Sequence, residues 1–466
     1  MSSVYAHFIG VGGAGMSGIA RVLHERGVVV TGSDLKDSRY ARSLAEAGVK
    51  VTIGHSAENL GDPEVVVVSS AIQESNPELA EARRRGIDVW PRAKMLAHVG
   101  RGSLTLAVAG THGKTTTSSM LATTLAGMGL DPTFLIGGEL NDIGANARRG
   151  SGDYYVVEAD ESDGSFLYLD SHLAIVTNIE ADHLDHYSGI DDVVATFGTF
   201  IGNIAEEGAA VVCADDERLP TLAREHARGR VVTYGSVTTA DVRCDSLLRD
   251  GAGHRFEVCL PDGSRHAARI GVPGVHMVLN ATGVLAAIWA LGLDVASAIE
   301  PLAAFTGVHR RFETVGVIDG VTVVDDYAHH PTEVKATLAA AKSSGFGRVW
   351  VVFQPHRYSR TAALGDDFGE AFSDADRVVL MDVYSAGEAP IPGVSGKTVL
   401  DALLVERPRA DVAYFPHRGD VAGYLGSRVR SGDLVMTMGA GDVTALAGEL
   451  VRELESRAGK GTVQCR

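Results

Sequence analysis

Short apolar runs and amphipathic stretches alternate along almost the whole chain. Such alternation is typical of α/β units, in which buried parallel strands are joined by helices that cover the sheet. The first unit is expected over residues 1–102, with a helix from Leu79 to Arg85 and a linker at residues 100–103. Its strands are predicted at residues 4–9, 28–33, 49–53 and 65–69.

A second unit is expected over residues 103–311, beginning with an apolar strand from Leu104 to Ala109. Polar and apolar side chains alternate at residues 241–248 and 255–270, which indicates antiparallel strands added to this sheet. A helix from His276 to Leu291 is expected to close the unit. Its remaining strands are predicted at residues 133–136, 154–159, 173–178, 209–213 and 231–234.

The third unit is expected over residues 312–466, where strands and helices alternate in the same way. The three units together predict an α/β protein of three domains, each built on a mainly parallel sheet. The strands of the third unit are predicted at residues 321–325, 349–353, 378–382, 412–415 and 434–438.

Composition and charge narrow the class of protein. Of the 466 residues 45% are hydrophobic and 22% charged, as in a globular protein, and the net charge of −17 argues against a nucleic acid or an anionic membrane as partner. The four cysteines form no C-x-x-C pair, which indicates reduced thiols. We see no signal-peptide pattern, and polar residues interrupt the most apolar stretch, Val278 to Val295. We therefore expect a cytoplasmic protein, a monomer or weak homodimer.

Residues 107–117 form a glycine-rich, lysine-bearing turn between a strand and a helix predicted from Thr115 to Met128. Backbone N–H groups of such a turn bind phosphate at the helix N-terminus, with Lys114 reaching the outer oxygens and the Thr115 hydroxyl on Mg²⁺. Only two residues separate the glycines, fewer than in the usual pattern, and an ordinary turn with a surface lysine is the alternative. The central domain is thus expected to be P-loop ATPase-like. Its predicted ATP-binding loop comprises Gly110, Thr111, His112, Gly113, Lys114, Thr115 and Thr116.

A second glycine-rich loop, G-x-G-x-x-G at residues 10–15, lies between the first strand and a helix predicted from Met16 to Arg26. Asp34 ends the next strand, at the place of the acidic residue that bonds a ribose in dinucleotide-binding domains. The first domain is expected to be Rossmann-like, and the third is expected to share that architecture. The loop fits NAD, but a UDP-sugar also carries a diphosphate and a ribose, and tight packing alone is a further alternative. Ser70 lies at the same sheet edge.

Two further strands of the central unit end in acidic clusters. Glu158 ends one strand, and Asp182 and His183 follow the next. The carboxyl ends of parallel strands meet at one edge, so these groups are expected close to Lys114, where they can hold divalent metal against a triphosphate. The metal ligands are predicted to be Thr115, Glu158 and His183, with room for two Mg²⁺ ions. Helix capping is the alternative for the other acidic residues.

Several long motifs, in one order over nearly the whole chain, resemble the Mur ligase family of ATP-dependent amide-forming enzymes in peptidoglycan assembly. The motifs are Gly110-Thr-His-Gly-Lys-Thr-Thr, Glu158-Ala-Asp-Glu-Ser-Asp, Asn178-Ile-Glu-Ala-Asp-His, His276-Met-Val-Leu-Asn, Arg310-Arg-Phe-Glu, Asp326-Tyr-Ala-His-His-Pro-Thr-Glu and Phe353-Gln-Pro-His-Arg-Tyr-Ser-Arg.

The resemblance implies a role for each domain. The first domain would bind a UDP-sugar. The second domain would bind ATP, with His276 and Asn280 near the adenine. Arg310 and Arg311 would contact phosphate from the hinge into the third domain. The implied catalytic residues are Lys114, Glu158, His183 and His329. The implied UDP-sugar residues are Gly12, Gly13, Gly15, Met16, Ser17, Asp34 and Ser70. The implied amino-acid residues are Tyr327, His329, His330, Arg357 and Arg360.

The implied reaction joins L-alanine to the carboxylate of UDP-N-acetylmuramate. ATP would phosphorylate the carboxylate, and the amine would displace phosphate from the acyl phosphate. A ligase that attaches a tripeptide to the same UDP-sugar in wall recycling is the nearest alternative. An NAD-dependent oxidoreductase and a non-catalytic nucleotide sensor are more distant ones. Sister ligases carry a carbamylated lysine after the Asp-His motif, but residues 193–200 contain no lysine.

Overall fold

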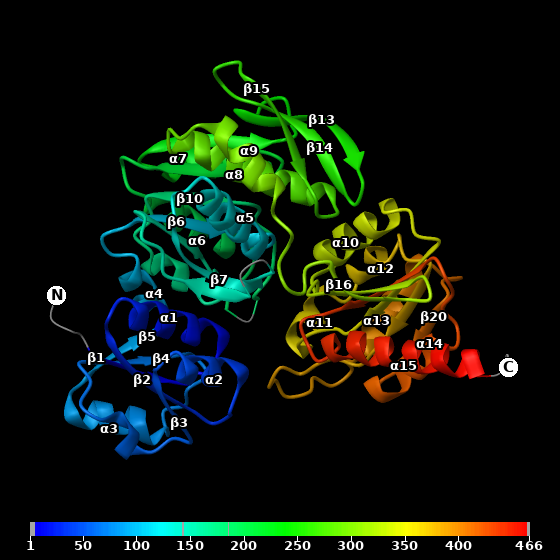
Figure 1. The fold of residues 1–466 in the computed structure, drawn as a ribbon, viewed down its shortest axis with the longest axis horizontal. Coiled ribbons are helices and arrows are strands. Elements are labelled where there is room, and N and C mark those ends of the chain that lie inside the picture. Colours follow the sequence, from blue (N-terminus) through cyan, green and yellow to red (C-terminus); the bar gives the residue numbers. More distant parts are fainter. Residues whose placement is uncertain (1–4, 142–143, 185, 464–466) are drawn as a thin grey trace.

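The computed structural model describes residues 5–141, 144–184 and 186–463. Three sheets form in chain order, each with helices packed against it, and Figure 1 shows them as three bodies arranged around a common centre. The predicted α/β class with mainly parallel sheets is confirmed. No helix in the described ranges is both long and apolar enough to span a membrane.

The first sheet is wholly parallel, with strand order β3-β2-β1-β4-β5. The predicted strands form, and the sheet gains an edge strand, β5, and a helix, α4, which the sequence pattern did not reveal because both are short and partly polar. The strands are β1 (Tyr5–Ile9), β2 (Val29–Asp34), β3 (Lys50–Ile53), β4 (Val65–Val68) and β5 (Asp88–Pro91). The helices are α1 (Ala14–Glu25), α2 (Arg39–Glu46), α3 (Pro77–Arg85) and α4 (Arg92–Val99).

The central sheet has the order β15-β14-β13-β12-β11-β10-β6-β9-β7-β8. Its strands are β6 (Leu104–Ala109), β7 (Thr133–Leu140), β8 (Ala145–Arg148), β9 (Tyr154–Glu158), β10 (Leu173–Val176), β11 (Ala209–Cys213), β12 (Arg230–Gly235), β13 (Val242–Asp250), β14 (Gly253–Cys259) and β15 (Arg265–Ile270). Its helices are α5 (Lys114–Gly127), α6 (Ile190–Gly202), α7 (Leu219–His226), α8 (Val275–Ala290) and α9 (Val295–Ala303).

The predicted antiparallel addition to this sheet is confirmed for β14 and β15 but is wrong for the contact between β12 and β13, which is parallel. The reason lies in the short loop between them. The Asp241 carboxylate accepts hydrogen bonds from the Thr233 amide (2.8 Å) and hydroxyl (2.7 Å), which returns the chain to the side of β12. Val242 therefore lies beside Tyr234.

The third sheet has the order β16-β17-β21-β18-β19-β20 and is parallel except for the edge strand β16. Its strands are β16 (Glu313–Ile318), β17 (Val321–Asp326), β18 (Arg348–Phe353), β19 (Arg377–Leu380), β20 (Val412–Tyr414) and β21 (Asp433–Met438). Its helices are α10 (Pro331–Ser343), α11 (Tyr358–Leu364), α12 (Phe368–Ala371), α13 (Gly396–Glu406), α14 (Val421–Gly426) and α15 (Thr444–Val463).

The hydrophobic cores distinguish the three bodies. One continuous buried cluster runs from the first sheet through α1 into the central sheet, where Leu135 and Ala147 belong to it. The third sheet has separate cores on its two faces, one around Phe353 and the other around Trp350. The first two bodies are therefore joined by apolar packing, whereas the third has cores of its own. The exact domain limits at residues 102 and 311 stay a prediction.

Candidate active site at the junction of three domains

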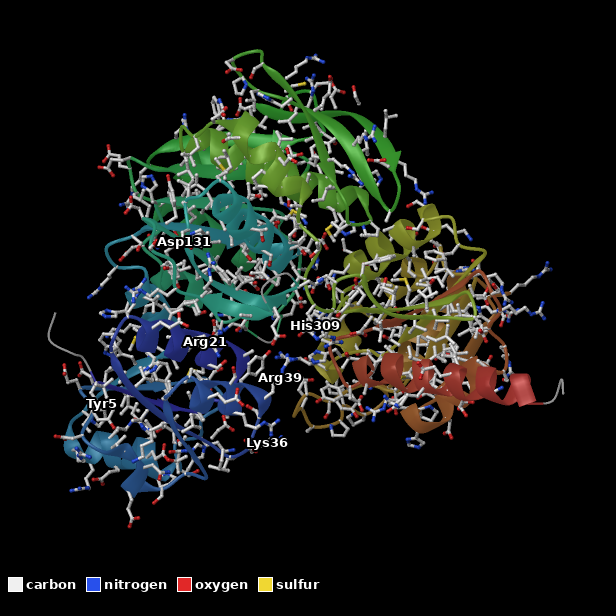
Figure 2. The ribbon with its side chains drawn as sticks, viewed as in Figure 1. Tyr5, Arg21, Lys36, Arg39, Asp131 and His309 are labelled. Carbon is white, nitrogen blue, oxygen red and sulfur yellow. The ribbon has the colours of Figure 1, made fainter. Side chains whose placement is uncertain are left out.

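A cavity of about 460 Å³ lies where the three bodies meet. Arg39 and Tyr40 from α2 line it on one side, and His309 lines it from the segment that leads to the third sheet. Figure 2 labels Arg39 and His309 at this junction. Most of the remaining lining residues lie at or after the carboxyl ends of β6, β9, β10, β17 and β18, and others come from β7 and from the segment before β16. The carboxyl ends of parallel strands thus form the site, as expected for open α/β sheets.

The predicted phosphate loop lies between β6 and α5, and its backbone is open to a ligand. Gly113, with φ of +83°, precedes the helix, and no side chain caps the first N–H groups of α5. Gly110 has φ of +132°, and a Cβ there would lie 2.1 Å from the Thr177 hydroxyl. Only glycine permits this turn, which leaves unpaired helix donors for an anion.

Lys114 is held within this loop by neighbouring acceptors. Its Nζ donates to the carbonyls of Gly110 (2.7 Å) and Thr111 (3.1 Å) and to the Glu161 carboxylate (2.7 Å). Burial alone would lower the pKa of Lys114, but the charges of Glu161 and Asp160 outweigh it and raise that pKa. The amine therefore stays a cation at the place where phosphate oxygens are expected.

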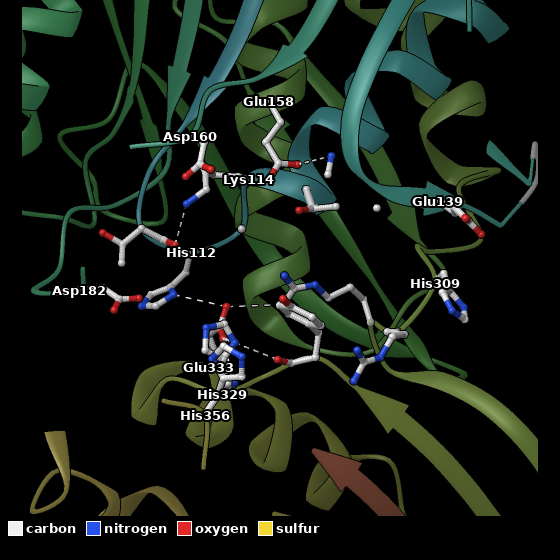
Figure 3. Close-up of a pocket in the computed structure, with 18 of the residues that line it drawn as sticks. His112, Lys114, Glu139, Glu158, Asp160, Asp182, His309, His329, Glu333 and His356 are labelled. Carbon is white, nitrogen blue, oxygen red and sulfur yellow. Dashed lines mark hydrogen bonds and ion pairs between the residues drawn. The ribbon is translucent and has the colours of Figure 1, made fainter. Parts of the chain in front are cut away.

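The three predicted metal ligands, Thr115, Glu158 and His183, all line the cavity. The Glu158 carboxylate accepts a hydrogen bond from the Gly137 amide at 2.8 Å, and Figure 3 shows it on the same side of the cavity as Lys114. Burial lowers the pKa of His183, so its imidazole is neutral and has a lone pair to offer. A hydroxyl, a carboxylate and a neutral imidazole fit a divalent metal beside phosphate.

A different group of metal-ligating side chains, His112, Glu180 and His330, has ligand atoms within 4.8 Å of one another. Its charges are balanced without a metal. Burial alone would lower the pKa of His112, but hydrogen bonds to Glu180 and Glu333 raise it to about 9. The imidazole is therefore protonated at neutral pH, and we interpret the group as an ion-pair network.

The residues expected near the adenine lie behind the loop. Asn280 is buried against Gly113, where a Cβ would meet its Oδ1 at 3.1 Å. Burial, with a smaller effect of Arg311, lowers the pKa of His276 to about 4. Among the described residues the cavity lining includes neither of these, nor Gly110 and Thr116. Their proximity to the loop fits the expectation, but their contact with adenine stays a prediction.

The two hinge arginines line the cavity but differ in their partners. The Arg310 guanidinium donates to Asp325 (2.8 Å) and to the Gly439 carbonyl (2.6 Å), which anchors it to the third sheet. Arg311 is partly buried, with 23% of its side chain exposed, lies 3.5 Å from Glu333 and, like Arg310, packs over the Tyr327 ring. Arg311 is the better placed of the two to contact a phosphate.

Four of the residues expected to bind the amino acid line the cavity: Tyr327, His329, Arg357 and Arg360. The buried Arg360 already makes a bidentate ion pair with Asp182 of the central domain, with bonds of 3.0–3.1 Å. Its guanidinium is therefore already paired within the protein, and its contact with the amino acid stays a prediction. The pair ties the amino-acid side of the site to the segment that carries His183.

His330 lies elsewhere than expected. It is the N-cap of α10, where its Nδ1 accepts a hydrogen bond from the Thr332 amide, and it is 5% exposed. Within the described residues the cavity lining includes His329 but not His330. Its assignment to the amino-acid pocket is therefore not supported, because the ring stabilises the start of the helix instead.

The first glycine loop is stabilised by its own domain. The Asp34 carboxylate accepts the Gly12 amide at 2.9 Å, so it orders the loop, and a Cβ on Gly12 would lie 2.7 Å from the Ser38 hydroxyl. The side chains of Met16 and Ser17 are buried, and the Ser17 amide donates to the Gly13 carbonyl at 2.9 Å, which fixes the start of α1. Gly13, Gly15 and Ser70 lie on or beside this loop, with Ser70 exposed.

The first glycine loop lies beside the acidic end of β9. A small cavity of about 110 Å³ is lined by Ala14 and Gly15 of the first loop and by Glu158 and Asp160 of the central domain. Arg92 also lines this cavity, 3.8 Å from Asp160. Glu158 and Asp160 line the main cavity as well, so the same two carboxylates adjoin both the first loop and the space beside the phosphate loop.

Sequence reasoning missed several residues of the site. His356 and Glu333 lay inside motifs that were quoted without a role for them, so a signal existed. Arg39 and Tyr40 had no local signal, because only the packing of α2 near the hinge places them at the cavity. Glu161 lay in the acidic cluster after β9, and its position beside Lys114 needed the fold.

Comparison with known proteins agrees with this architecture. The chain matches the family models for the Mur ligase family catalytic domain (residues 5–103), the Mur ligase middle domain (108–288) and the Mur ligase glutamate ligase domain (310–441). It is 49% identical to a UDP-N-acetylmuramate–L-alanine ligase of Mycolicibacterium smegmatis, over 98% of this chain and 96% of that protein. Identity is 51% with the protein of that name from Rubrobacter xylanophilus, over 96% of this chain and 99% of that protein.

Solved structures show the same three-domain architecture. The UDP-N-acetylmuramate-alanine ligase of Thermotoga maritima has a TM-score of 0.81 at 29% identity, covering 97% of this chain and 99% of that one. A murein peptide ligase of Psychrobacter arcticus has a TM-score of 0.72 at 25% identity, covering 97% of this chain and 98% of that one. The matches extend over all three sheets and over both phosphate loops. The chain belongs to the Mur ligase family.

Proposed function

We propose that this protein is an ATP-dependent ligase that joins L-alanine to the carboxylate of UDP-N-acetylmuramate in peptidoglycan synthesis, giving ADP and phosphate. The observation that carries the proposal is the cavity between the three domains. One wall holds a cationic triphosphate loop, another adjoins the UDP-sugar loop, and a third carries histidines and arginines suited to an amino acid. Relatives at 45–51% identity over nearly the whole chain bear this activity in their names.

The reaction needs an activated carboxylate, because oxide is a poor leaving group. A carboxylate oxygen of the lactyl group attacks the γ-phosphorus of ATP, ADP leaves, and an acyl phosphate results. The alanine nitrogen then attacks the acyl carbon, the C–O bond to phosphate breaks, and the amine releases a proton. Lys114 and Arg311 stabilise charge on the transferring phosphoryl group, in the way expected for phosphoryl transfer.

Thr115, Glu158 and His183 would hold Mg²⁺, which would neutralise charge on the ATP phosphates. Two ions remain our proposal. The lysine whose carbamate serves sister ligases is absent from α6, so the chain supplies His183 without that partner. Replacing Glu158 with glutamine tests the assignment: the Mg²⁺ concentration for half-maximal rate rises, and an unchanged value contradicts it.

His329 orients the amino acid in this proposal. Its Nδ1 donates to the Tyr327 carbonyl at 3.0 Å, which leaves Nε2 as an acceptor for the alanine ammonium group. Burial lowers the pKa of His329 to about 3. So weak a base accepts a hydrogen bond but does not hold the proton that the amine releases, which favours orientation over general-base catalysis.

A single small amino acid fits the site better than a tripeptide. A second cavity shares Asp182, His183, Arg357 and Arg360 with the main one, and its volume is about 170 Å³. This is well under half the volume of the main cavity, about 460 Å³. The ligase that recycles a tripeptide is therefore the second candidate, supported by its structural similarity alone.

Product analysis by mass spectrometry tests the proposal. The enzyme is mixed with ATP, Mg²⁺, UDP-N-acetylmuramate and a pool of amino acids, and the UDP-sugar is expected to gain one alanine residue. Phosphate release with L-alanine against tripeptide separates the two candidates. The match to the Mur ligase family catalytic domain over residues 5–103 favours a UDP-sugar over NAD as the ligand of the first domain. Titration with NADH is therefore expected to show no fluorescence energy transfer from the protein to the nucleotide. Such energy transfer, or no amide product, would refute the proposal.

A further inference from the structure

Glu333 is a buried carboxylate at the third position of α10, in the third domain. Its Oε2 accepts the backbone amides of His329 (3.1 Å) and His330 (3.5 Å), in a capping box. The carboxylate therefore shapes the turn that carries His329, the residue proposed to orient the amino acid. Burial alone would raise its pKa, but the cationic His112 and Arg311 beside it hold the pKa of Glu333 well below its usual range.

The same carboxylate contacts cationic or polar groups from three separate segments. His112 Nδ1 of the phosphate loop lies 3.4 Å from Oε1, and Arg311 Nη1 of the hinge lies 3.5 Å from it. His329 Nδ1 lies 3.4 Å from Oε2. Figure 3 shows Glu333 between His112 and His329, with the phosphate loop beyond. One side chain thus joins the ATP loop, the hinge and the amino-acid pocket.

The position of His112 depends on the conformation of the phosphate loop, because its backbone is hydrogen-bonded within that loop's surroundings. Its amide donates to Asn178 at 2.9 Å, and its carbonyl accepts from the Thr177 hydroxyl and from the Asn178 side chain (3.1 Å). Its ring lies between Glu333 of the third domain and Glu180 of the central domain. Any movement of residues 111–114 around a triphosphate therefore acts on Glu333 through this ion pair.

We infer that Glu333 is a positioning residue that couples the occupancy of the ATP loop to the affinity of the amino-acid pocket. The inference rests on the proposed function and names the means by which that site orders its substrates. A buried carboxylate that loses its cation is costly, so Glu333 and His112 move together. Because Glu333 also carries the backbone of His329, a shift of the loop reaches the acceptor of the alanine ammonium group.

Direct binding of L-alanine measures this coupling. Calorimetric titrations of the UDP-N-acetylmuramate complex are made with and without a non-hydrolysable ATP analogue. For the wild-type protein the analogue is expected to tighten alanine binding about tenfold, a typical coupling between two sites. In Glu333→Gln, which retains the shape but not the charge, the ratio is expected to fall close to one. An unchanged ratio in that variant would overturn the inference.

Glu180→Gln is the matched variant. Glu180 faces the same His112 ring at 3.4 Å, yet its neighbours are Thr332 and His330 rather than His329 or Arg311. We expect Glu180→Gln to keep most of the coupling. Loss equal to that in Glu333→Gln would assign the effect to the charge of His112 and overturn the role of Glu333. Glu370→Gln, at an exposed pair with Lys335, serves as the remote control.

A double-mutant cycle between His112→Gln and Glu333→Gln gives a second measurement that does not need binding heats. The KM for alanine is expected to rise about tenfold in each variant, and the double variant is expected to show little further increase, because both lose one contact. If the two increases in the KM for alanine multiply in the double variant, the two side chains act independently, which would contradict the contact between His112 and Glu333. The KM for UDP-N-acetylmuramate serves as the internal reference and is expected to change little. Wild-type protein that makes no alanyl product would refute the proposed function itself, whereas an active wild type without coupling refutes only this inference.

Discussion

The two interfaces of the central domain are built in opposite ways. The interface with the first domain has an apolar centre: Gly18 of α1 packs against Leu135 and Ala147, where a Cβ would meet both at 3.0 Å, and its ion pairs, Arg39–Glu139 and Arg92–Asp160, are partly exposed. The interface with the third domain is charged, with the buried Arg360–Asp182 pair and the Glu180–Thr332 hydrogen bond of 2.6 Å. Apolar packing holds two domains as one unit, whereas ion pairs depend on geometry, pH and ligands.

This difference assigns distinct tasks to the two interfaces. The first domain shares a continuous core with the second, so the first glycine loop and the phosphate loop lie in two domains that are packed as one unit. The third domain brings the amino-acid pocket, and its contacts with the second are made by residues of the site itself. Binding of substrates can therefore alter the second interface without disturbing the first.

The largest expected effect comes from a substitution that leaves both interfaces intact and lowers only the rate of catalysis. In Lys114→Ala the cation that faces the phosphates is lost, and turnover is expected to fall by about a thousandfold, as for other preorganised charge-stabilising groups. Phosphate release measures turnover, and circular dichroism checks that the fold is kept. Retained turnover would contradict the role of Lys114.

Arg360→Lys breaks the charged interface at its most buried point. A lysine keeps the charge but loses the bidentate geometry with Asp182, so the KM for alanine is expected to rise by roughly tenfold to a hundredfold. The KM values for ATP and UDP-N-acetylmuramate are expected to change far less. Equal increases for all three substrates would show that the pair merely supports the fold.

Gly18→Val tests the apolar interface. The added side chain meets Leu135 and Ala147, and overpacking of this kind costs about 1–3 kcal/mol of stability. The unfolding temperature is expected to fall while the KM for alanine stays the same. The control is Gly419→Val, where nothing lies within 4 Å of the new Cβ. A change in alanine KM without loss of stability would contradict the separation of the two interfaces.

The smallest expected effect is the pH dependence of the charged interface. Hydrogen bonds to Glu180 and Glu333 raise the pKa of His112 from 6.5 to about 9. A raised pKa stabilises the folded state fully below about pH 6.5, and this stabilisation is lost as the pH rises through about 9; it amounts to at most about 3 kcal/mol.

Thermal unfolding of the wild-type protein and His112→Gln checks this effect. The groups that face the ring are Glu180, Glu333 and His330. The difference in unfolding temperature between the two proteins is expected to be largest near pH 6 and to shrink toward pH 10. A difference that grows with pH would mean that the ring is neutral in the folded protein.

Much of the fold could be predicted because its signals are local. A buried parallel strand such as β4, with its run of valines, is recognisable from adjacent residues alone. The strand β5 and the helix α4 were missed because they are short and partly exposed. The parallel contact of β13 with β12 depends on the Asp241–Thr233 bonds, and such a contact has no signature in the pattern of polar and apolar residues.

The candidate site residues also divide into those with a local signal in the sequence and those whose contacts depend on the fold. The phosphate loop could be identified from its glycines and lysine, because a turn at a helix N-terminus is a local structure. His330 was assigned to the amino-acid pocket because the family resemblance implied it, yet in the fold its side chain caps α10. The ion pair of Arg360 with Asp182 joins residues 178 positions apart, which no local pattern predicts.

The sequence by itself determined the class of fold, the two glycine-rich loops and the family resemblance, because turns, strands and helix starts depend on neighbouring residues. Only the tertiary structure decided which charges meet: His112 with Glu333, Arg360 with Asp182, and Lys114 with Glu161. These pairs form between segments distant in the chain, and whether a buried charge is tolerated depends on the partner that the fold brings to it.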